Sequence, residues 1–186
     1  EKLDGIFVLL NGNLADDFFR TTLQRNLSVP IITTSLVTDD NRLVNLGKAA
    51  HGVHHISAWS KNISNKENEI FVKGYKKLYT KKPDQFGFLG YESGLIINDA
   101  ILKCQGDISG NRLAKGIRSC EIESPGGRIS VNKKSGFVKN PVYLCETKLS
   151  GFNIPENVIL DQYAAVSEFD EHFISSNTDL RSGFIN

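Results

Sequence analysis

The stretch SNKENEIFVKGYKKLYTKKPDQFGFLGYESGLIINDAILKC, residues 64–104, predicts two helices joined at Pro83. Ser64 and Glu67 have the spacing of a capping box, which marks the start of a helix. An apolar stripe at helical period follows, formed by Ile70, Phe71, Gly74, Tyr75 and Leu78. The second helix, about Phe86 to Cys104, carries apolar residues on nearly every side. We therefore expect it to be buried between other elements.

The composition is that of a globular protein. The chain has 186 residues, of which 40% are hydrophobic, and a formal net charge of +1. This length suffices for one ordinary core or for parts of two small ones. Basic and acidic residues balance, and no basic cluster is interleaved with stacking aromatic residues, so no nucleic-acid partner is expected. No apolar run approaches the ~20 residues that a membrane-spanning helix needs.

The first residues and the cysteines indicate which kind of protein the chain comes from and which covalent links it can form. The sequence contains no methionine, and its first apolar run opens close to Glu1 without a signal-like region before it, so we expect a segment of a longer protein. Cys104, Cys120 and Cys145 are too few and too widely spaced for a disulfide scaffold or a zinc site. Two alternatives remain for them: one bridge between Cys120 and Cys145, or three buried thiols.

The first part of the chain alternates between strand and helix patterns. Residues 5–10, GIFVLL, form a continuous apolar run typical of a parallel strand covered on both faces. Asn13 is a good N-cap for a helix that ends near Asn26, and residues 29–34 form the next strand. A loop, a short helix from Asp39 to Leu46 and a strand from Gly52 to Trp59 follow. This alternation predicts an α/β fold with an open, mostly parallel sheet and helices on both faces.

The pattern is looser after residue 104. Ser109 or Asn111 is a candidate cap for a short helix that runs through Arg118. Residues 127–132 and 142–147 are expected to pair as a β-hairpin. Residues 158–173 fit a helix or a strand equally well. Residues 175–186 have the character of a loop or tail.

Polar residues follow the first two predicted strands. Ligands of open α/β sheets lie outside the carboxyl ends of the strands, which directs attention to residues 10–13 and 34–35. Asn11, Gly12 and Asn13 place amide side chains and free backbone N–H groups at a helix N-terminus, which suits a polar or anionic ligand group. The alternative is an Asn-Gly turn followed by an ordinary N-cap, without a ligand.

The residue types that usually carry catalysis form no catalytic grouping in the sequence. His51, His54 and His55 flank a predicted strand, where His54 and His55 point to opposite faces, so a metal site is not expected. The aspartate pairs at residues 16–17 and 39–40 are explained as first-turn acids of helices. The serines lack a nucleophile elbow, and no Gly-rich phosphate loop is present. We therefore expect neither an enzyme nor a cofactor.

Five short motifs follow one another in a recognisable order. They are DGIF at residues 4–7, LGKAAHGV at 46–53, FVKGY at 71–75, GYE at 90–92 and PGGRI at 125–129. Over about Leu3 to Leu149 this order resembles the C-terminal half of the type I periplasmic solute-binding proteins. These are the branched-chain amino-acid, amide and urea receptors that serve ABC transporters. The resemblance implies a periplasmic-binding-protein-like type I fold, of which this chain is a partial two-lobe piece.

In that family two α/β lobes, joined by hinge strands, close on a small ligand. The resemblance divides the chain into a later part of the second lobe (1–51), a strand and hinge crossing (52–63), first-lobe helices (64–118), a return crossing with a β-hairpin (119–151) and a C-terminal extension (152–186). The N-terminal half, with the sheet of the first lobe, would be missing. That missing half would cover the apolar helix.

The resemblance also implies ligand-lining positions. Those after the first and second strands fall at Asn11 to Gly12 and at Thr34 to Ser35, and the aromatic position before the second helix falls at Phe86. The full set of candidate ligand-binding residues is Asn11, Gly12, Asn13, Thr34, Ser35, Phe86 and Tyr91. Amino-acid binders of the family often have an aromatic residue at the first position and a carboxylate at the second. This chain has Asn-Gly and Ser instead, so a neutral polar ligand is at least as well supported as an amino acid.

The function implied by the resemblance is that of an extracytoplasmic solute-binding component of an ABC transporter. It would hold a small polar ligand (an amino acid, an amide or a urea-like molecule) in the periplasm or outside the cell. Its partners would be a membrane permease and the missing half of the same protein. One alternative is a ligand-sensing module of the same fold, and another is a flavodoxin-like or Rossmann-type enzyme, whose phosphate loop is missing here.

Overall fold

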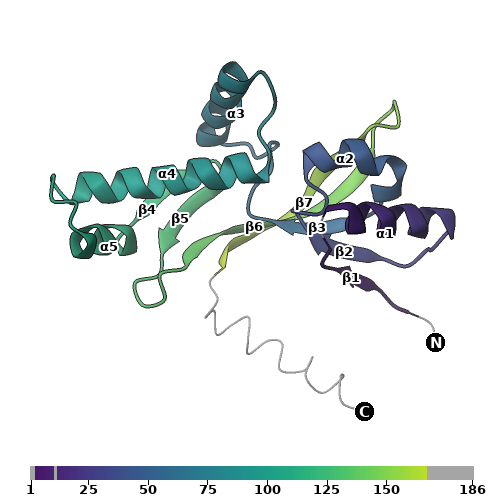
Figure 1. The fold of residues 1–186 in the computed structure, drawn as a ribbon, viewed down its shortest axis with the longest axis horizontal. Helices are drawn as coiled ribbons and strands as arrows, with labels where there is room; N and C mark the ends of the chain where they lie inside the picture. The colour runs from purple at the N-terminus through teal and green to yellow at the C-terminus, as the bar shows by residue number, and fades with distance from the viewer. Residues whose placement is uncertain (1–2, 11, 167–186) are drawn as a thin grey trace, which may run out of the picture.

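The computed structural model describes residues 3–10 and 12–166, which form two groups of elements linked by long strands (Figure 1). The first group comprises β1 (Ile6–Val8), α1 (Gly12–Gln24), β2 (Ile31–Thr34), α2 (Asp40–Leu46), the 3-10 turn η1 (Gly47–Ala50) and β3 (His54–Ser57). The second comprises α3 (Lys66–Tyr79), α4 (Gln85–Lys103), α5 (Gly110–Arg118), β4 (Glu121–Ser124) and β5 (Gly127–Val131). Strands β6 (Val138–Leu149) and β7 (Pro155–Val166) run between the groups.

The sheet is mixed. Its strand order is β1-β2-β3-β6-β5-β4, and β7 pairs with β6. Among the described strands, β1, β2 and β3 pair in parallel, whereas the other neighbours are antiparallel. The predicted α/β fold is confirmed, but parallel pairing is confined to these three strands. The reason is that β6 enters from the second group of helices and runs back alongside β3.

Strand β6 corrects the predicted β-hairpin. Only its first residues pair with β5, in the register Val131 to Val138 and Ser130 to Lys139. The predicted partner segment, residues 142–147, lies instead between β3 and β7. The register of β6 shifts around Pro141, which lacks a backbone N–H and cannot continue a regular ladder. The strand alternative is correct for residues 158–166, while residues 167–186 lie outside the described part.

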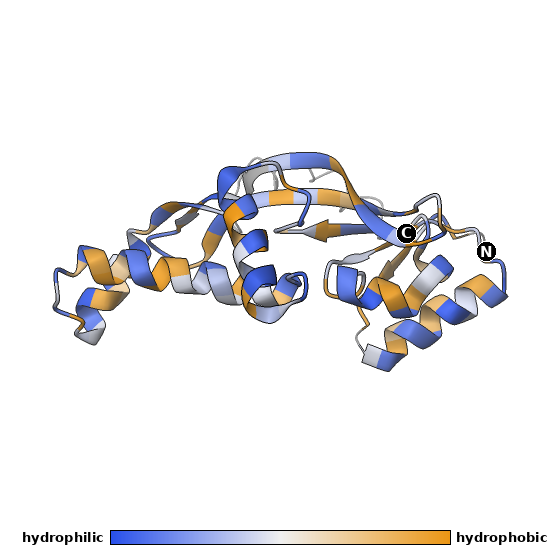
Figure 2. Ribbon diagram, turned by 90° about the horizontal axis from the view of Figure 1, so that it is seen from above, coloured by the Kyte–Doolittle hydropathy of each residue, from blue (hydrophilic) through white to orange (hydrophobic). Residues whose placement is uncertain are grey.

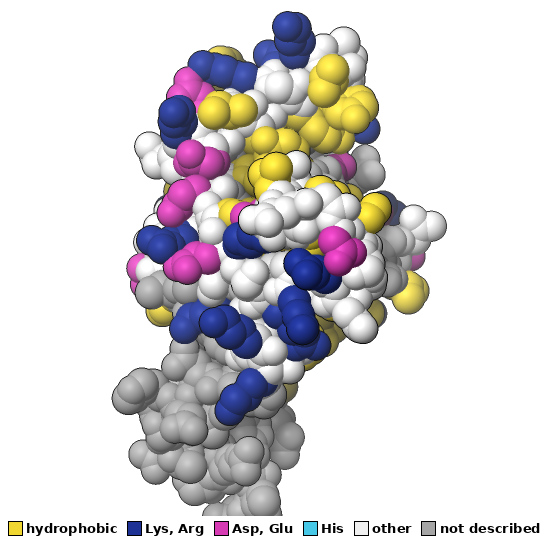
Figure 3. Space-filling view, turned by 90° about the vertical axis from the view of Figure 1, so that its left-hand side faces the viewer, with side chains coloured by type: hydrophobic (Ala, Val, Ile, Leu, Met, Phe, Trp, Pro, Cys, Tyr) yellow, Lys and Arg dark blue, Asp and Glu magenta, His cyan; other side chains and the backbone are white. Residues whose placement is uncertain are grey.

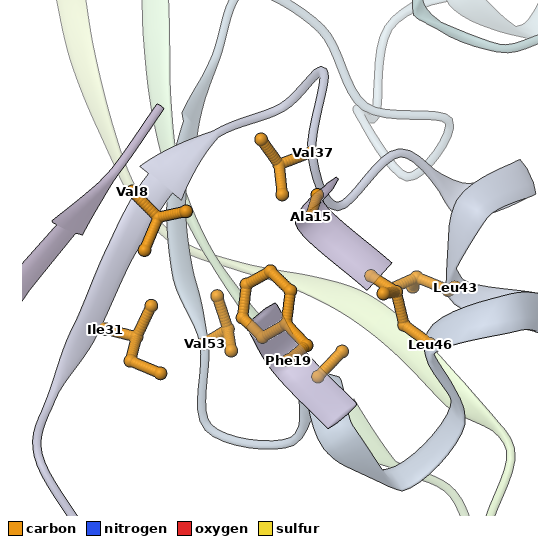
Figure 4. Close-up of a cluster of buried hydrophobic side chains, with 9 residues drawn as sticks. Val8, Ala15, Phe19, Ile31, Val37, Leu43, Leu46 and Val53 are labelled. Carbon is orange, nitrogen blue, oxygen red and sulfur yellow. The ribbon is translucent and has the colours of Figure 1, made fainter. Parts of the chain in front are cut away.

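The core of the first group lies between the strands and helices α1 and α2 (Figure 4). Phe19 of α1 is fully buried in its centre. The other buried members are Val8, Ala15, Ile31, Val37, Leu43, Leu46, Ala50 and Val53. Phe7 and Ile32 alternate with Val8 and Ile31 along their strands, so they point to the opposite face, where their side chains are 63% and 44% exposed.

The described helices lie along one side of the long strands (Figure 2). We expected helices on both faces of the sheet. In residues 3–10 and 12–166 the second face of β1 to β3 is not covered, and Phe7, Ile32 and Ile56 are exposed on it. An apolar sheet face of this kind is normally packed against further elements.

The second core joins α3 and α4 to the end of β3. The ring of Trp59 stacks on that of Phe88, with centroids 5.4 Å apart, and meets the ring of Phe71 edge-on at 5.7 Å. Helix α3 is capped by Asn65 rather than by the predicted Ser64, because the Asn65 side chain accepts a hydrogen bond from the Asn68 N–H at 2.7 Å.

Helix α4 has the predicted length but a different environment. It buries Phe88, Glu92 and Ala100, whereas Leu89 and Ile97 remain 46% and 47% exposed. The carboxylate of Glu92 accepts a hydrogen bond from Ser124 of β4 at 2.6 Å. One face of α4 therefore packs on the β4–β5 hairpin, and the other has no cover among the described residues. All three cysteines are buried free thiols.

Gly126 provides a test of this packing. A Cβ atom at residue 126 would lie 2.7 Å from the carbonyl oxygen of Ala58 and 3.0 Å from the ring of Phe88, whereas one at Gly90 of α4 meets nothing within 4 Å. We expect Gly126→Ala to lower the free energy of unfolding by about 1–3 kcal/mol, because overpacking forces the backbone to shift. Gly90→Ala should raise it by about 0.5–1 kcal/mol through helix propensity. Urea denaturation measures both changes, and equal values would contradict the packing described here.

Candidate functional site

The carboxyl ends of β1, β2 and β3 lie side by side at one edge of the sheet. The hydroxyl of Thr33 donates to the carbonyl of Val8 at 2.7 Å, and the N–H of Ser35 donates to the carbonyl of Ile56 at 3.1 Å. These bonds fix the loops after β1 and β2 next to the point where the chain leaves β3 for the second group. The carboxyl edge of the parallel strands is the usual ligand position in open α/β sheets.

The structure places the predicted residues of the two loops at this edge. Gly12 starts α1 with a φ of 54°, a conformation that favours glycine, and its carbonyl accepts a hydrogen bond from Arg42 of α2 at 2.8 Å. Asn13 is exposed in the first turn of α1, and Thr34 and Ser35 are half-buried at the end of β2. Asn11 lies outside the described residues.

Phe86 and Tyr91, the other two predicted residues, lie together on α4 but face a different hollow. Phe86 is 70% exposed in the first turn, and the ring of Tyr91 lies 4.7 Å from that of Phe71. Both border a groove of about 660 Å³ between α3 and α4, whose walls also include Phe71 and Tyr75. Hydrophobic side chains gather over these two helices in Figure 3.

A small polar cavity separates the two groups of elements. Its lining comes from both: Ser35, Thr38, Asp39, Asp40, His55, Trp59, Ser60, Gln85 and Asn157. The free volume is about 10 Å³, which is room for one water molecule. Of the residues predicted in the two loops, Ser35 lines this cavity together with Gln85 of α4.

Gln85 and Asn157 were not predicted from the sequence, yet they organise the cavity. The side-chain amide of Gln85 donates to the hydroxyl of Ser57 and to the carbonyl of Trp59, both at 2.8 Å. Asn157 of β7 donates to the carbonyl of Thr38 at 2.8 Å and accepts from Thr147 at 2.9 Å. Both residues act through partners distant in sequence, so no local pattern indicates them.

Burial dominates the electrostatics of the cavity. It raises the pKa of Asp39, against the opposing effect of hydrogen bonds from the N–H groups of Asn41 and Gln85. It lowers the pKa of His55 from 6.5 to about 4, although nearby Asp40 favours the charged form. Within the described residues, Nδ1 of His55 and the hydroxyl of Thr38 are buried without a hydrogen-bond partner. The cavity therefore favours neutral polar groups over a cationic imidazole.

The described residues offer no set of three or more His, Cys, Asp and Glu side chains that could hold a metal ion. His54 and His55 follow each other along β3 and face opposite sides of the sheet, and His55 is buried while His54 is only half-buried. What the sheet edge offers to a small molecule is amide, hydroxyl and backbone groups, whereas the cavity has room for a single water molecule.

The family model described as "Periplasmic binding protein" matches residues 1–152 of the chain. Among curated protein sequences none matches significantly. In the described part of the chain, no helix has the length and apolar character needed to cross a membrane.

Solved structures match with the same fold. An ABC transporter substrate-binding protein from Sphaerobacter thermophilus gives a TM-score of 0.81 at 20% identity, covering 87% of this chain and 45% of that one. A solute-binding protein of an ABC transporter from Rhodopseudomonas palustris BisB5, in complex with 3,4-dihydroxybenzoic acid, gives 0.79 at 24% identity, with 90% and 47% covered. A leucine-binding protein from Thermotoga maritima gives 0.73 at 21%, with 87% and 45% covered. The chain thus spans about half the length of these proteins.

The buried imidazole of His55 predicts an acid-sensitive fold. Its pKa is about 4 in the folded protein and near 6.5 when unfolded, so the unfolded state binds more protons between these values. The contribution is fully present above pH 6.5 and is lost as the pH falls to 4, by up to about 3 kcal/mol. Raised pKa values at Asp39 and Glu92 act in the opposite direction at acid pH, so the test must be a difference between variants.

We expect His55→Leu to flatten the loss of unfolding free energy between pH 6.5 and 4, measured by urea denaturation at several pH values. His51→Leu, which removes an exposed histidine, is the matched control and should leave the slope in place. If the pH profiles of wild type and His55→Leu run parallel, His55 is not the group that titrates.

Proposed function

Because the chain belongs to the periplasmic binding protein family, we propose that it is the C-terminal portion of a solute receptor for an ABC transporter. The family consists of binding proteins rather than enzymes, in agreement with the expectation from sequence. The observation that carries the proposal is the junction at the sheet edge. There Ser35 from one group of elements and Gln85 from the other line the same polar cavity. In a receptor that closes by a hinge motion, the ligand is held where two such groups meet.

We propose the following division of the chain. Residues 1–51 are the later part of the second lobe, 52–63 the first crossing, 64–118 helices of the first lobe, and 119–151 the return crossing. Residues 152–186 are a C-terminal extension. The supporting observation is that the two cores are separate: one lies around Phe19 in the first group, and the other around Trp59 in the second.

The proposed ligand is a small polar molecule held by residues 11–13 and 34–35 at the sheet edge, with Phe86 and Tyr91, which border the groove between α3 and α4, as the proposed contacts from the second group. Amino acids, amides and urea-like molecules fit the polar loops. Aromatic acids enter the list because a solved relative was crystallised with 3,4-dihydroxybenzoic acid. An aromatic side chain such as Phe86, 70% exposed in the first turn of α4, is a suitable contact for any of them. The proposed partner is a membrane permease, and the proposed location is the periplasm or the cell exterior.

The exposed face of the sheet supports the proposal that a further part of the same protein covers it. Phe7 and Ile32 are direct neighbours in the register, and Ile56 extends the same face on β3. These side chains are 63%, 44% and 51% exposed. Covering them stabilises a fold by roughly 25 cal/mol per Å² of apolar surface buried. We therefore propose that the remaining part of the complete protein packs here and on the exposed face of α4.

This division predicts that one substitution has a small effect on the chain of residues 1–186 and a larger effect on the complete protein. In the chain of residues 1–186, Ile32→Thr should change the free energy of unfolding by less than about 0.5 kcal/mol, as expected for an exposed side chain. In the complete protein the same change should destabilise by about 1–3 kcal/mol, because the side chain is then buried. Val44→Thr on α2, where the side chain is 80% exposed, is the control and should be neutral in both. Equal effects of Ile32→Thr in both proteins would show that this face stays open.

The ligand contact is testable once a ligand is found. A thermal-shift screen of the complete protein against amino acids, amides, urea and aromatic acids identifies it, since a ligand of the native state raises the melting temperature. Phe86→Ala and Tyr91→Ala should then each weaken binding by about 1–3 kcal/mol in calorimetry. Leu102→Ala, on the same helix and also 70% exposed, should have no effect. Unchanged affinity in the Phe86 and Tyr91 variants would remove these two residues from the site.

A further inference from the structure

The first turns of α2 and α4 exchange hydrogen bonds. Asp39 caps α2 with one oxygen, Oδ1, which accepts from the Asn41 N–H at 2.9 Å, and its Oδ2 accepts from the Gln85 N–H of α4 at 2.9 Å. Asp84 does the reverse. Its Oδ1 caps α4 by accepting from the Gly87 N–H at 2.7 Å, and its Oδ2 accepts from the Asn41 side-chain amide at 2.9 Å.

Each carboxylate thus serves its own helix and the other helix at once. An N-cap needs only one oxygen, because one acceptor satisfies one free N–H group of the first turn. The second oxygen is used here for a bond between residues 43 or 46 positions apart in the sequence. Asp39 is 8% exposed, so its bond to α4 is shielded from water, whereas the bond from Asn41 to Asp84 is exposed.

These bonds join the two groups of elements without a covalent link. The described chain runs between the groups in the segment after β3 and along the paired strands β6 and β7 (Figure 1). The Gln85 side chain also donates to the hydroxyl of Ser57, at the end of β3, and to the carbonyl of Trp59 in the segment that follows. A rotation about the crossings would separate Asp39 and Asn41 on α2 from Asp84 and Gln85 on α4.

We propose that Asp39, Asn41 and Asp84 form a clasp that holds the two groups together and positions Ser35 against the first turn of α4. Asp39 ends the short loop that begins at Ser35, and Asp84 immediately precedes the turn that carries Phe86. The clasp fixes the distance between the two sides of the proposed ligand site without contacting the ligand. Its effect on ligand binding rests on the proposed function, whereas its effect on the conformation does not.

Such a clasp sets how often the groups are in contact. A ligand that binds only the closed arrangement has an apparent affinity reduced by the fraction of molecules that are closed. Variants of the clasp should therefore change opening first and affinity second. Asn41 is the best position to change, because it is exposed and its side chain, unlike its backbone, takes no part in capping α2.

Opposite charges at residue 41 give opposite predictions. Asn41→Asp places a carboxylate against that of Asp84, although an acid in the first turn of α2 favours the helix itself. Asn41→Lys places a cation there and should tighten the contact. In the chain of residues 1–186, we expect the Gln85 amide hydrogen of Asn41→Asp to exchange about fivefold faster than in wild type, as for two like charges about 4 Å apart in water. In Asn41→Lys it should exchange more slowly.

The amide hydrogen of Gly87 is the internal reference, because its bond to Asp84 lies within α4 and should keep its exchange rate in all variants. Asn45→Asp and Asn45→Lys, one turn further along α2 and exposed, make the same charge changes away from Asp84. The clasp is wrong if Gln85 and Gly87 change together, or if the variants at residue 45 act like those at residue 41.

The consequence for the cleft is measured in the complete protein without ligand. Spin labels on Leu23→Cys of α1 and Leu102→Cys of α4, both exposed positions, report the distance between the groups, while the native cysteines are buried. Asn41→Asp should shift the distance distribution toward longer values and Asn41→Lys toward shorter ones. If the exchange rate of the Gln85 amide hydrogen changes but the spin-label distance does not, the clasp does not position the two groups. A failure to find any ligand would count against the proposed function and leave these two readouts unaffected.

Discussion

The described structure depends on Trp59, the residue at which the chain leaves the sheet for the second group of helices. Its ring is 2% exposed and is stacked on Phe88, while its indole N–H donates to Asn68 of α3 at 2.7 Å. Its carbonyl accepts from Gln85 of α4. The side chain and the backbone carbonyl of Trp59 thus fix the end of β3, helix α3 and helix α4 relative to one another. A buried indole is stable in such a place only when its N–H is paired, and Asn68 meets that requirement.

The sequence predicted the elements whose pattern is local. The run at residues 5–10 predicted β1, and the apolar period after residue 64 predicted α3, since both signals arise within a few residues. The pairing of β6 could not be predicted, because its partner β3 lies some ninety positions earlier and Pro141 merely marks where the strand changes neighbours. Apolar residues all around α4 predicted complete burial. The exposed Leu89 and Ile97 show that such a pattern indicates what a helix can bury, without stating whether the partner belongs to the same sequence.

The candidate site divides in the same way. The loops after β1 and β2 were predicted because the carboxyl edge of a parallel sheet follows from the order of strands and helices. Ser35 lies at that edge as expected. Gln85 and Asn157 reach it through bonds to residues such as Thr38, which is 119 positions from Asn157. Asp39 was interpreted as an acid favoured by the helix dipole. That interpretation fits the bond from the Asn41 N–H to Oδ1 of Asp39. It does not predict the bond that Oδ2 accepts from the Gln85 N–H of α4.

The chemistry of the junction suits two bodies that come apart. Each group of elements keeps its own apolar core, around Phe19 in one and around Phe88 in the other. Between them lie carboxylates, amides and a cavity of about 10 Å³. If the junction were apolar, separating the two groups would expose its apolar surface to water. The free-energy cost of that exposure would hold the groups in the closed arrangement. Separating Asp39 from Gln85 exchanges a protein hydrogen bond for bonds to water, at a net free energy of about 1.5–3 kcal/mol for a bond to a carboxylate. In the receptor proposed above, a ligand with modest differential affinity could therefore shift the balance between an open and a closed form, which a junction built from leucine and phenylalanine would oppose.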